Sequence, residues 1–221
     1  MKTIKFAIFL ALFAMLTVGA FGDSFYSFAG SYHRFYEQYP QENYGRDLEG
    51  GEFIIMLNYY PEKTPIGWYI RTSFGGNTTG LEWKGNSMLP IETYGTSEIQ
   101  LSAGPSYRVK LGNIIHLPIS LGPIFSITRE DGYDYYYFNN DSSASFTSAL
   151  NLGLHLDVSI VLNPVNWFTI INGFYTSFDF LHWERGYMEG RYRSINSGNF
   201  EFQQYTGFKI GFYLGIGLHF E

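Results

Sequence analysis

Residues 208–221 (FKIGFYLGIGLHFE) alternate strictly between two kinds of side chain. Apolar residues occupy every second position, namely Phe208, Ile210, Phe212, Leu214, Ile216, Leu218 and Phe220. A period of two residues predicts a β-strand that turns one face to an apolar medium. In water, a long strand of this kind at a sheet edge would aggregate, whereas a closed barrel in lipid has no such edge. The segment therefore favours a transmembrane β-barrel.

The composition agrees with a lipid boundary. Aromatic residues make up 20% of the 221 residues and charged residues 15%, against about a quarter charged in an ordinary soluble domain. The mean hydropathy is only -0.10, because strands that alternate apolar and polar residues average out. We find no shift of composition that marks a linker, so a single folded domain is expected.

The N-terminal residues have the pattern of a secretory signal. Lys2 and Lys5 precede an apolar run at residues 6–18, and small residues follow at 19–22. We therefore predict a signal peptide at residues 1–22 and an outer-membrane β-barrel at residues 23–221. The chain has no cysteine, which excludes a lipoprotein anchor, a disulfide framework and a thiolate metal site.

Charge and histidine placement exclude two further classes. The net charge of -6 argues against nucleic-acid binding, which needs clustered Lys and Arg. The histidines are scattered along the chain at His33, His116, His155, His182 and His219. We therefore expect no metal centre and no cofactor.

The connections between the segments of alternating apolar and polar residues are alternately short and long. Short joints with turn-forming residues fall at 60–65, 110–113 and 163–166, and long joints fall at 37–51, 77–95, 129–145 and 184–199. Outer-membrane barrels have short periplasmic turns and long extracellular loops. Three turns and four loops predict an all-β, eight-stranded antiparallel up-and-down barrel, with strands near 24–36, 52–60, 66–75, 98–109, 115–128, 146–162, 168–180 and 208–221.

Alternation alone does not distinguish this barrel from a soluble eight-stranded one, which turns its apolar face inward. Aromatic residues near the expected strand ends favour lipid outside, because they suit a membrane interface. These are Tyr59, Trp68, Trp167 and Phe168 on the turn side and Phe35, Tyr36 and Trp183 on the loop side. The opposite face is rich in glycine and small hydroxyl residues, as a narrow filled lumen requires.

The segment 213–220 (YLGIGLHF) resembles the C-terminal insertion signal of bacterial outer-membrane proteins through Tyr213, Gly215, Leu218 and Phe220. The whole chain after the signal resembles the small barrels of the OmpA, OmpX and OmpW class. The resemblance implies residence in the outer membrane of a bacterial cell, lipid contact and insertion by the barrel-assembly machinery, and we expect a monomer. One departure is that Glu221 follows the aromatic residue on which such proteins usually end.

Several charged residues fall on the face predicted to line the lumen, namely Arg71, Glu98, Arg108, His155, Asp157, Asp179 and Lys209. Inward charges need partners. Counting from the loop midpoints predicts that Arg71 lies opposite Glu98 and that Asp179 lies near Lys209. We expect His155 and Asp157 to form an interior hydrogen-bonded pair and the whole set to be a structural plug, with ion conduction as the alternative.

Two barrel enzymes that act on lipid A offer a catalytic alternative. The His-x-Ser pattern of the deacylase is missing, since none of the five histidines has Ser two residues later. His33 with Asp141 and Ser142 fits the loop residues of the palmitoyltransferase, but its N-terminal amphipathic helix has no room before Phe25. The sequence therefore predicts no enzyme.

The long connections carry the residue types that anchor protein interfaces. Candidate contacts are Tyr135, Tyr136, Tyr137, Arg185, Arg191 and Arg193. They favour an adhesin-like role with a host or extracellular protein as partner, although the aromatic residues could simply extend the barrel above the bilayer. The alternative is an OmpW-like channel for small hydrophobic molecules, since Pro105, Pro118 and Pro123 fall within strands, where proline removes ladder hydrogen bonds.

Overall fold

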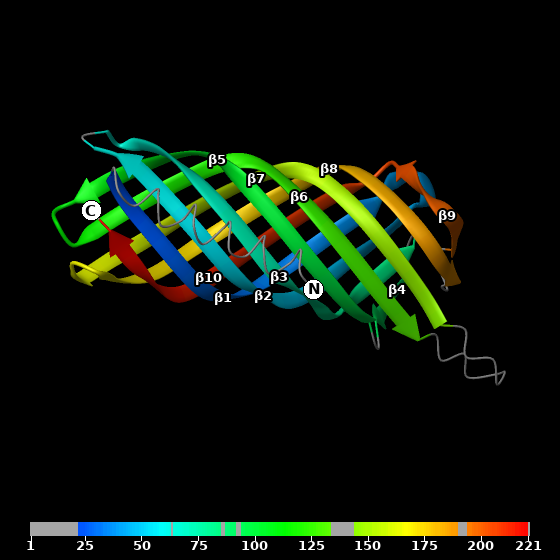
Figure 1. Ribbon diagram of the computed structural model, residues 1–221. Coiled ribbons are helices and arrows are strands. Elements are labelled where there is room, and N and C mark those ends of the chain that lie inside the picture. Colours follow the sequence, from blue (N-terminus) through cyan, green and yellow to red (C-terminus); the bar gives the residue numbers. More distant parts are fainter. Residues whose placement is uncertain are drawn as a thin grey trace, which may run out of the picture.

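The last strand pairs with the first, and this pairing closes the sheet. In the computed structural model of the chain, β10 pairs with β1 along one edge and with β8 along the other, so eight antiparallel strands form a ring in the order β10-β1-β2-β3-β5-β6-β7-β8. Figure 1 shows the resulting barrel of tilted strands. The predicted fold class is confirmed.

The structure describes residues 22–62, 64–84, 87–91, 94–133, 144–189 and 194–220. The predicted signal peptide lies outside these residues apart from Gly22. The elements are β1 (Gly22–Tyr39), η1 (Pro40–Glu42), β2 (Tyr44–Pro61), β3 (Ile66–Lys84), β4 (Ser87–Ile91), β5 (Tyr94–Leu111), β6 (Ile115–Tyr133), β7 (Ala144–Val165), β8 (Phe168–Glu189), β9 (Ser194–Gln203) and β10 (Thr206–Phe220). Within these ranges, no helix has the length and apolar character needed to span a membrane.

The two ends of the barrel differ as predicted, with corrections at three of the expected long loops. Short turns join β2 to β3, β5 to β6 and β7 to β8 at one end, here called the turn end, where β10 also ends (Figure 1). At the opposite end, here called the loop end, the expected long loop at 37–51 is absent. The strands continue instead to Tyr39 and from Tyr44, and Asn43 makes the reversal in the left-handed conformation with φ 50°. Two more expected loops contain short strands, β4 paired with β3 and β9 paired with β8.

Side chains alternate between lipid and lumen in the predicted sense. The apolar residues of β10 are outward and exposed, apart from the half-exposed Ile210, whereas Lys209, Tyr213 and His219 are buried inside. Apolar residues on the outward faces of β5, β6 and β7 are likewise exposed. The expected aromatic girdle needs one correction, because Phe35 points inward and is buried.

Two inward tyrosines lie over glycines of the neighbouring strand. Tyr213 pairs with Gly173, and Tyr175 pairs with Gly211, in the ladder between β10 and β8. A Cβ added at Gly173 would come within 2.3 Å of the Tyr213 ring, and one at Gly211 within 2.6 Å of the Tyr175 ring. Glycine is required at both positions because the ring occupies the space of a side chain. Both tyrosines belong to a buried cluster with Ile54, Met56, Phe25, Ala29, Tyr60, Val161 and Ile171.

We expect the substitution Gly173→Ala to lower the free energy of unfolding by about 1–3 kcal/mol, because the methyl group would force Tyr213 out of its place. Gly30→Ala is the matched control, since a Cβ at Gly30 meets no atom within 4 Å. Urea unfolding of both refolded variants, followed by tryptophan fluorescence, measures the difference. Equal loss in the two variants would contradict the packing role of Gly173.

Candidate functional site

An ion-pair cluster crosses the middle of the lumen. Lys209 Nζ lies 2.8 Å from Glu52 Oε1 and also binds the carboxylate of Glu98, while Arg71 Nη2 lies 3.0 Å from Glu52 Oε2. All four side chains are buried, and the two positive charges balance the two negative ones. Lys209 on β10 and Glu98 on β5 belong to strands that are four places apart in a ring of eight. Their contact therefore spans the barrel and blocks the lumen at this level.

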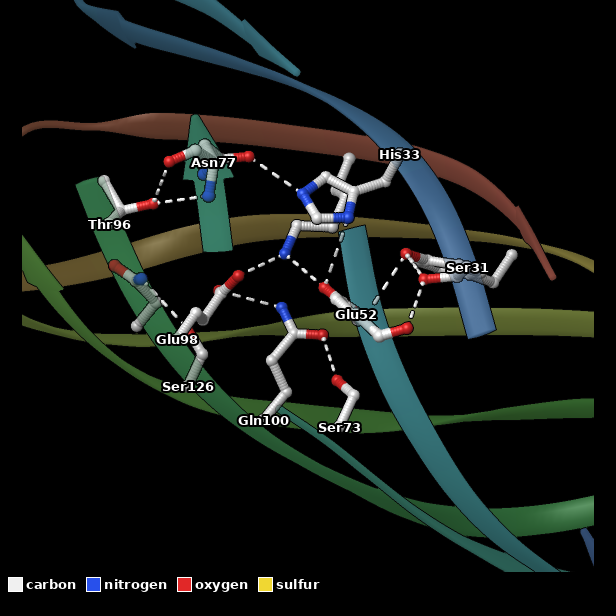
Figure 2. Close-up of polar contacts among 12 residues, drawn as sticks. Ser31, His33, Glu52, Ser73, Asn77, Thr96, Glu98, Gln100 and Ser126 are labelled. Carbon is white, nitrogen blue, oxygen red and sulfur yellow. Dashed lines mark hydrogen bonds and ion pairs between the residues drawn. The ribbon is translucent and has the colours of Figure 1, made fainter. Parts of the chain in front are cut away.

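Polar residues of neighbouring strands complete this cluster (Figure 2). The Gln100 amide nitrogen donates to Glu98 Oε1 at 2.8 Å, and Ser73 Oγ donates to the Gln100 amide oxygen at 3.2 Å. His33 Nε2 lies 2.8 Å from Asn77 Oδ1 and His33 Nδ1 lies 3.7 Å from Glu52. Buried charges are tolerated when further hydrogen bonds satisfy them, and here the hydrogen bond from Gln100 to Glu98 supplements the ion pair with Lys209.

A second buried cluster lies nearer the loop end. Arg46 Nε donates to Glu37 Oε2 and Arg46 Nη1 donates to Glu130 Oε1, each at 2.6 Å. Tyr205 Oη donates to the other oxygen of Glu37 at 3.2 Å. Tyr205 also stacks on His182, with ring centroids 4.2 Å apart. These contacts join β1, β2, β6, β8 and the connection that leads into β10, so they hold the outer part of the ring together.

On the other side of the central cluster the lumen is lined by tyrosines. Tyr213 Oη donates to Asp157 Oδ1 at 2.8 Å, and the Tyr60 and Tyr69 hydroxyls lie 2.6 Å from Ser106 and Ser102. The Arg71 guanidinium lies 4.4 Å from the ring centroid of Tyr175 on the opposite strand β8. Aromatic rings and hydroxyls thus occupy the lumen between the ion pairs and the turn end.

The structure places all seven residues of the predicted lumenal set inside the barrel. The predicted pair of Arg71 with Glu98 is wrong, whereas Asp179 does lie near Lys209, as predicted. Arg71 lies opposite Ser102 and binds Glu52, and its links to Glu98 run through Gln100 and through Lys209. Lys209 lies opposite Ser177, two residues from Asp179, and binds Glu52 and Glu98. The error arose because β4 and β9 occupy the connections, so the loop midpoints do not set the register. The register differs from the predicted one by four residues at Arg71 and by two at Lys209. Because both shifts are even, each side chain stays on the inner face of the sheet but lies opposite a different residue.

The expected His155–Asp157 hydrogen bond is also absent. Both ring nitrogens of His155 lack a hydrogen-bond partner in the described part of the chain, and its ring lies between those of Tyr69 and Tyr175. Asp157 binds Tyr213 instead. The reason is that side chains two residues apart on one strand face lie a full pleat repeat apart.

Sequence analysis missed residues that are central to these clusters, namely Glu52, His33, Glu37, Arg46 and Glu130. They lie on β1, β2 and the outer part of β6. Our strand limits excluded Glu37, Arg46 and Glu130, which were assigned to loops. Glu52 is separated from Met56 and Asn58 by an even number of residues along β2, so these residues share the inner face. This alternation is the signal that could have placed Glu52 inside the barrel.

The remaining predicted residues lie at the two ends. Four residues were predicted to form the insertion signal. Of these, Tyr213 covers Gly173, and Gly215 lies close to the backbone of β1. The other two, Leu218 and Phe220, face outward near the turn end. Arg185 is exposed on β8. Tyr135, Tyr136, Tyr137, Arg191 and Arg193 lie outside the described residues, as do Asp141 and Ser142. His33, which the palmitoyltransferase alternative combined with Asp141 and Ser142, lies inside the barrel in contact with Asn77.

Among the described residues, no group of three or more His, Asp or Glu side chains is arranged to hold a metal ion. The contacts within the lumenal clusters are ion pairs and hydrogen bonds. They neutralise buried charge and join opposite strands of the ring.

Comparisons with known proteins agree with this architecture. No protein-family model matches the chain. No curated protein matches it either. Among solved structures, the fold is similar to that of a major outer membrane protein from Thermus thermophilus, with a TM-score of 0.53 and 14% identity over 86% of this chain and 99% of that chain.

Two further solved structures match with lower TM-scores. Neisserial surface protein A gives 0.45 at 12% identity, over 87% of this chain and 96% of that chain. Ail, the attachment invasion locus protein of Yersinia pestis, gives 0.42 at 15% identity, over 90% of this chain and 99% of that chain.

The fold and its exposed apolar exterior define a class of protein. This chain has the fold of the small bacterial outer-membrane β-barrels, and its exposed outward apolar residues suit contact with lipid, as the predicted place in the outer membrane requires. The expected resemblance to the small eight-stranded barrels is confirmed at the level of the fold.

We expect Lys209→Met to lower the free energy of unfolding by about 3–5 kcal/mol, because it leaves Glu98 buried without its cation. The double variant Lys209→Met/Glu98→Gln should recover part of this loss, since the unpaired charge is then removed. Urea titration of the refolded proteins measures both.

The control is Arg34→Gln, which breaks the exposed ion pair between Arg34 and Asp47 on the outer surface and should change stability little. A double variant that is less stable than Lys209→Met would contradict the pairing of Lys209 with Glu98.

Proposed function

We propose that the protein acts at the cell surface, where strands β8 and β9 at the loop end bind an extracellular protein in an adhesin-like manner. The observation that carries this proposal is the position of β9. Its ladder pairs in the described part of the chain are all with β8, from His182–Gln203 to Glu189–Ser194. The ladder between β1 and β10 stops at Gln38–Thr206, so β9 extends beyond the end of β1. Its second edge thus offers backbone donors and acceptors to a partner strand.

The side chains at this edge suit recognition. Phe202 is 58% exposed and Phe200 is also exposed. The Arg185 guanidinium lies 4.6 Å from the ring centroid of Phe200, and Trp183 contacts Phe202 edge to face. Aromatic and arginine side chains held in place by such contacts are the usual anchors of protein interfaces.

The filled lumen supports a role at the surface. Lys209 and Glu98 meet across the barrel, so a solute would have to displace a neutralised ion-pair cluster to pass. Rigid scaffolds of this kind present function on their exposed ends. We propose that the role is not enzymatic, that the protein works as a monomer, and that the segment 213–220 is recognised during insertion by the barrel-assembly machinery.

We expect the double variant Phe200→Ser/Phe202→Ser and the single variant Arg185→Gln to reduce binding to a panel of purified matrix and serum proteins by about ten-fold or more, the usual effect of losing an interface anchor. Immobilised refolded protein and surface plasmon resonance give the affinity. Arg34→Gln is the matched control, because Arg34 is an exposed arginine outside this edge. Binding that is unchanged in all variants would refute the proposal.

A lateral conduit for apolar molecules is the second candidate, and the ladder around the three strand prolines favours it. Between β5 and β6 the paired residues stop at Ser102–Ile124 and resume at Ser106–Ser120, which leaves out the stretch with Pro105 and Pro123. The ladder of β6 with β7 is likewise interrupted at Pro118. Two observations rank this candidate below the first. Gly104 and Gly122 keep the two backbones in close approach, and the ion-pair cluster lies between this seam and the loop end.

If the seam is a conduit, a disulfide across it should abolish uptake of a fluorescent apolar solute into proteoliposomes. The chain has no cysteine, so Ala103→Cys/Pro123→Cys gives a single reducible link. Uptake should return on reduction. Equal uptake in liposomes with the oxidised, reduced and unaltered proteins would exclude the conduit.

A further inference from the structure

The turn end contains a cavity that the surface role does not use. Its volume is about 310 Å³ and its lining residues are Thr64, Pro65, Arg108 and Lys110. A cavity of this size is at the lower limit of small-molecule sites. Among the described residues that line it, two of four are cations, although the chain as a whole carries a net charge of -6.

These two cations share one carboxylate oxygen. Asp23 Oδ2 lies 2.5 Å from Arg108 Nη1 and 2.9 Å from Lys110 Nζ. In the described part of the chain, Asp23 is the acidic side chain that contacts them, so one positive charge is left without a counter-charge at the cavity. Glu62 in the neighbouring turn is exposed and is not among the lining residues.

Arg108 is held rigidly. Its side chain is buried, its guanidinium lies 4.3 Å from the ring centroid of Tyr60 and 5.8 Å from that of Phe25, and its backbone N–H donates to Pro65 O at 2.8 Å. Its Nε has no hydrogen-bond partner in the described residues. A buried guanidinium with unused donors is costly unless a ligand or water completes it.

Lys110 supplies the mobile part of the arrangement. Its side chain is 52% exposed at the end of β5, next to the turn that leads to β6. A planar guanidinium fixed at the base and a flexible ammonium at the rim are the two groups that proteins use for phosphate and carboxylate.

We propose that this cavity binds a small oxyanion, a phosphate or a carboxylate, between Arg108 and Lys110, and that Asp23 occupies part of the same site and competes with it. Because short turns of outer-membrane barrels face the periplasm, the anion would come from that side. Its source is either the phosphate of an inner-leaflet lipid headgroup or a free anion.

The test is titration of inorganic phosphate, and of acetate as a carboxylate, into protein refolded in phosphate-free amine-oxide micelles at constant ionic strength. Isothermal calorimetry and amide chemical shifts near Thr64 and Lys110 report binding. We expect Lys110→Gln to weaken binding by about ten-fold, through loss of a charge-assisted hydrogen bond. Asp23→Asn should strengthen binding, because it removes the competing carboxylate. The two substitutions therefore move the affinity in opposite directions, which a merely structural role of these residues would not do.

Phospholipid nanodiscs then distinguish the two sources. If a headgroup is the natural occupant, phosphate binds more weakly in nanodiscs than in micelles, whereas equal affinity in both indicates a free anion. Arg34→Gln, which removes an exposed arginine elsewhere, should leave the affinity unchanged. Absence of saturable binding of either anion, or affinities that are the same in Lys110→Gln, Asp23→Asn and the unaltered protein, would overturn the proposal.

Discussion

In the hydrocarbon layer of a membrane, a backbone N–H or C=O group finds no water, and an unpaired group costs several kcal/mol. The pairing of β10 with both β8 and β1 meets this constraint, because it leaves no sheet edge within the ring of eight strands. Closure also decides where every side chain points, since alternate residues face lipid and lumen. The outward apolar faces, the inward charges and the close approach of Tyr213 to Gly173 all follow from it.

An eight-stranded ring leaves a lumen that is just wide enough for side chains. Here those side chains divide into layers. Two clusters of ion pairs lie in the middle and towards the loop end, and tyrosines with apolar residues lie towards the turn end. Contacts such as that of Lys209 with Glu98 join strands on opposite sides of the ring. The interior therefore links opposite sides of the barrel wall, and the charges of Arg71, Lys209, Glu52 and Glu98 neutralise one another.

With the lumen filled, interaction with other molecules is left to the two ends, and the ends differ. At the loop end, β9 extends beyond β1 with an open edge and exposed phenylalanines. At the turn end, Arg108 and Lys110 line a small cavity with an excess of positive charge. One end suits an extended protein segment and the other a small anion, so a single rigid barrel can offer different chemistry on the two sides of the membrane.

The sequence by itself determined the class of fold, the number of strands in the ring and the inward or outward direction of most residues. These depend on local alternation and on turn residues such as Gly112 and Asn113, which can be recognised in the sequence. Tertiary structure decided which charges meet. Arg71 binds Glu52 and Lys209 binds Glu98 because strand register and closure bring together residues far apart in the chain. It also decided that β1 and β2 continue through an expected loop, and that β9 pairs with β8 beyond the end of β1, because strand length depends on the partner that each backbone group finds.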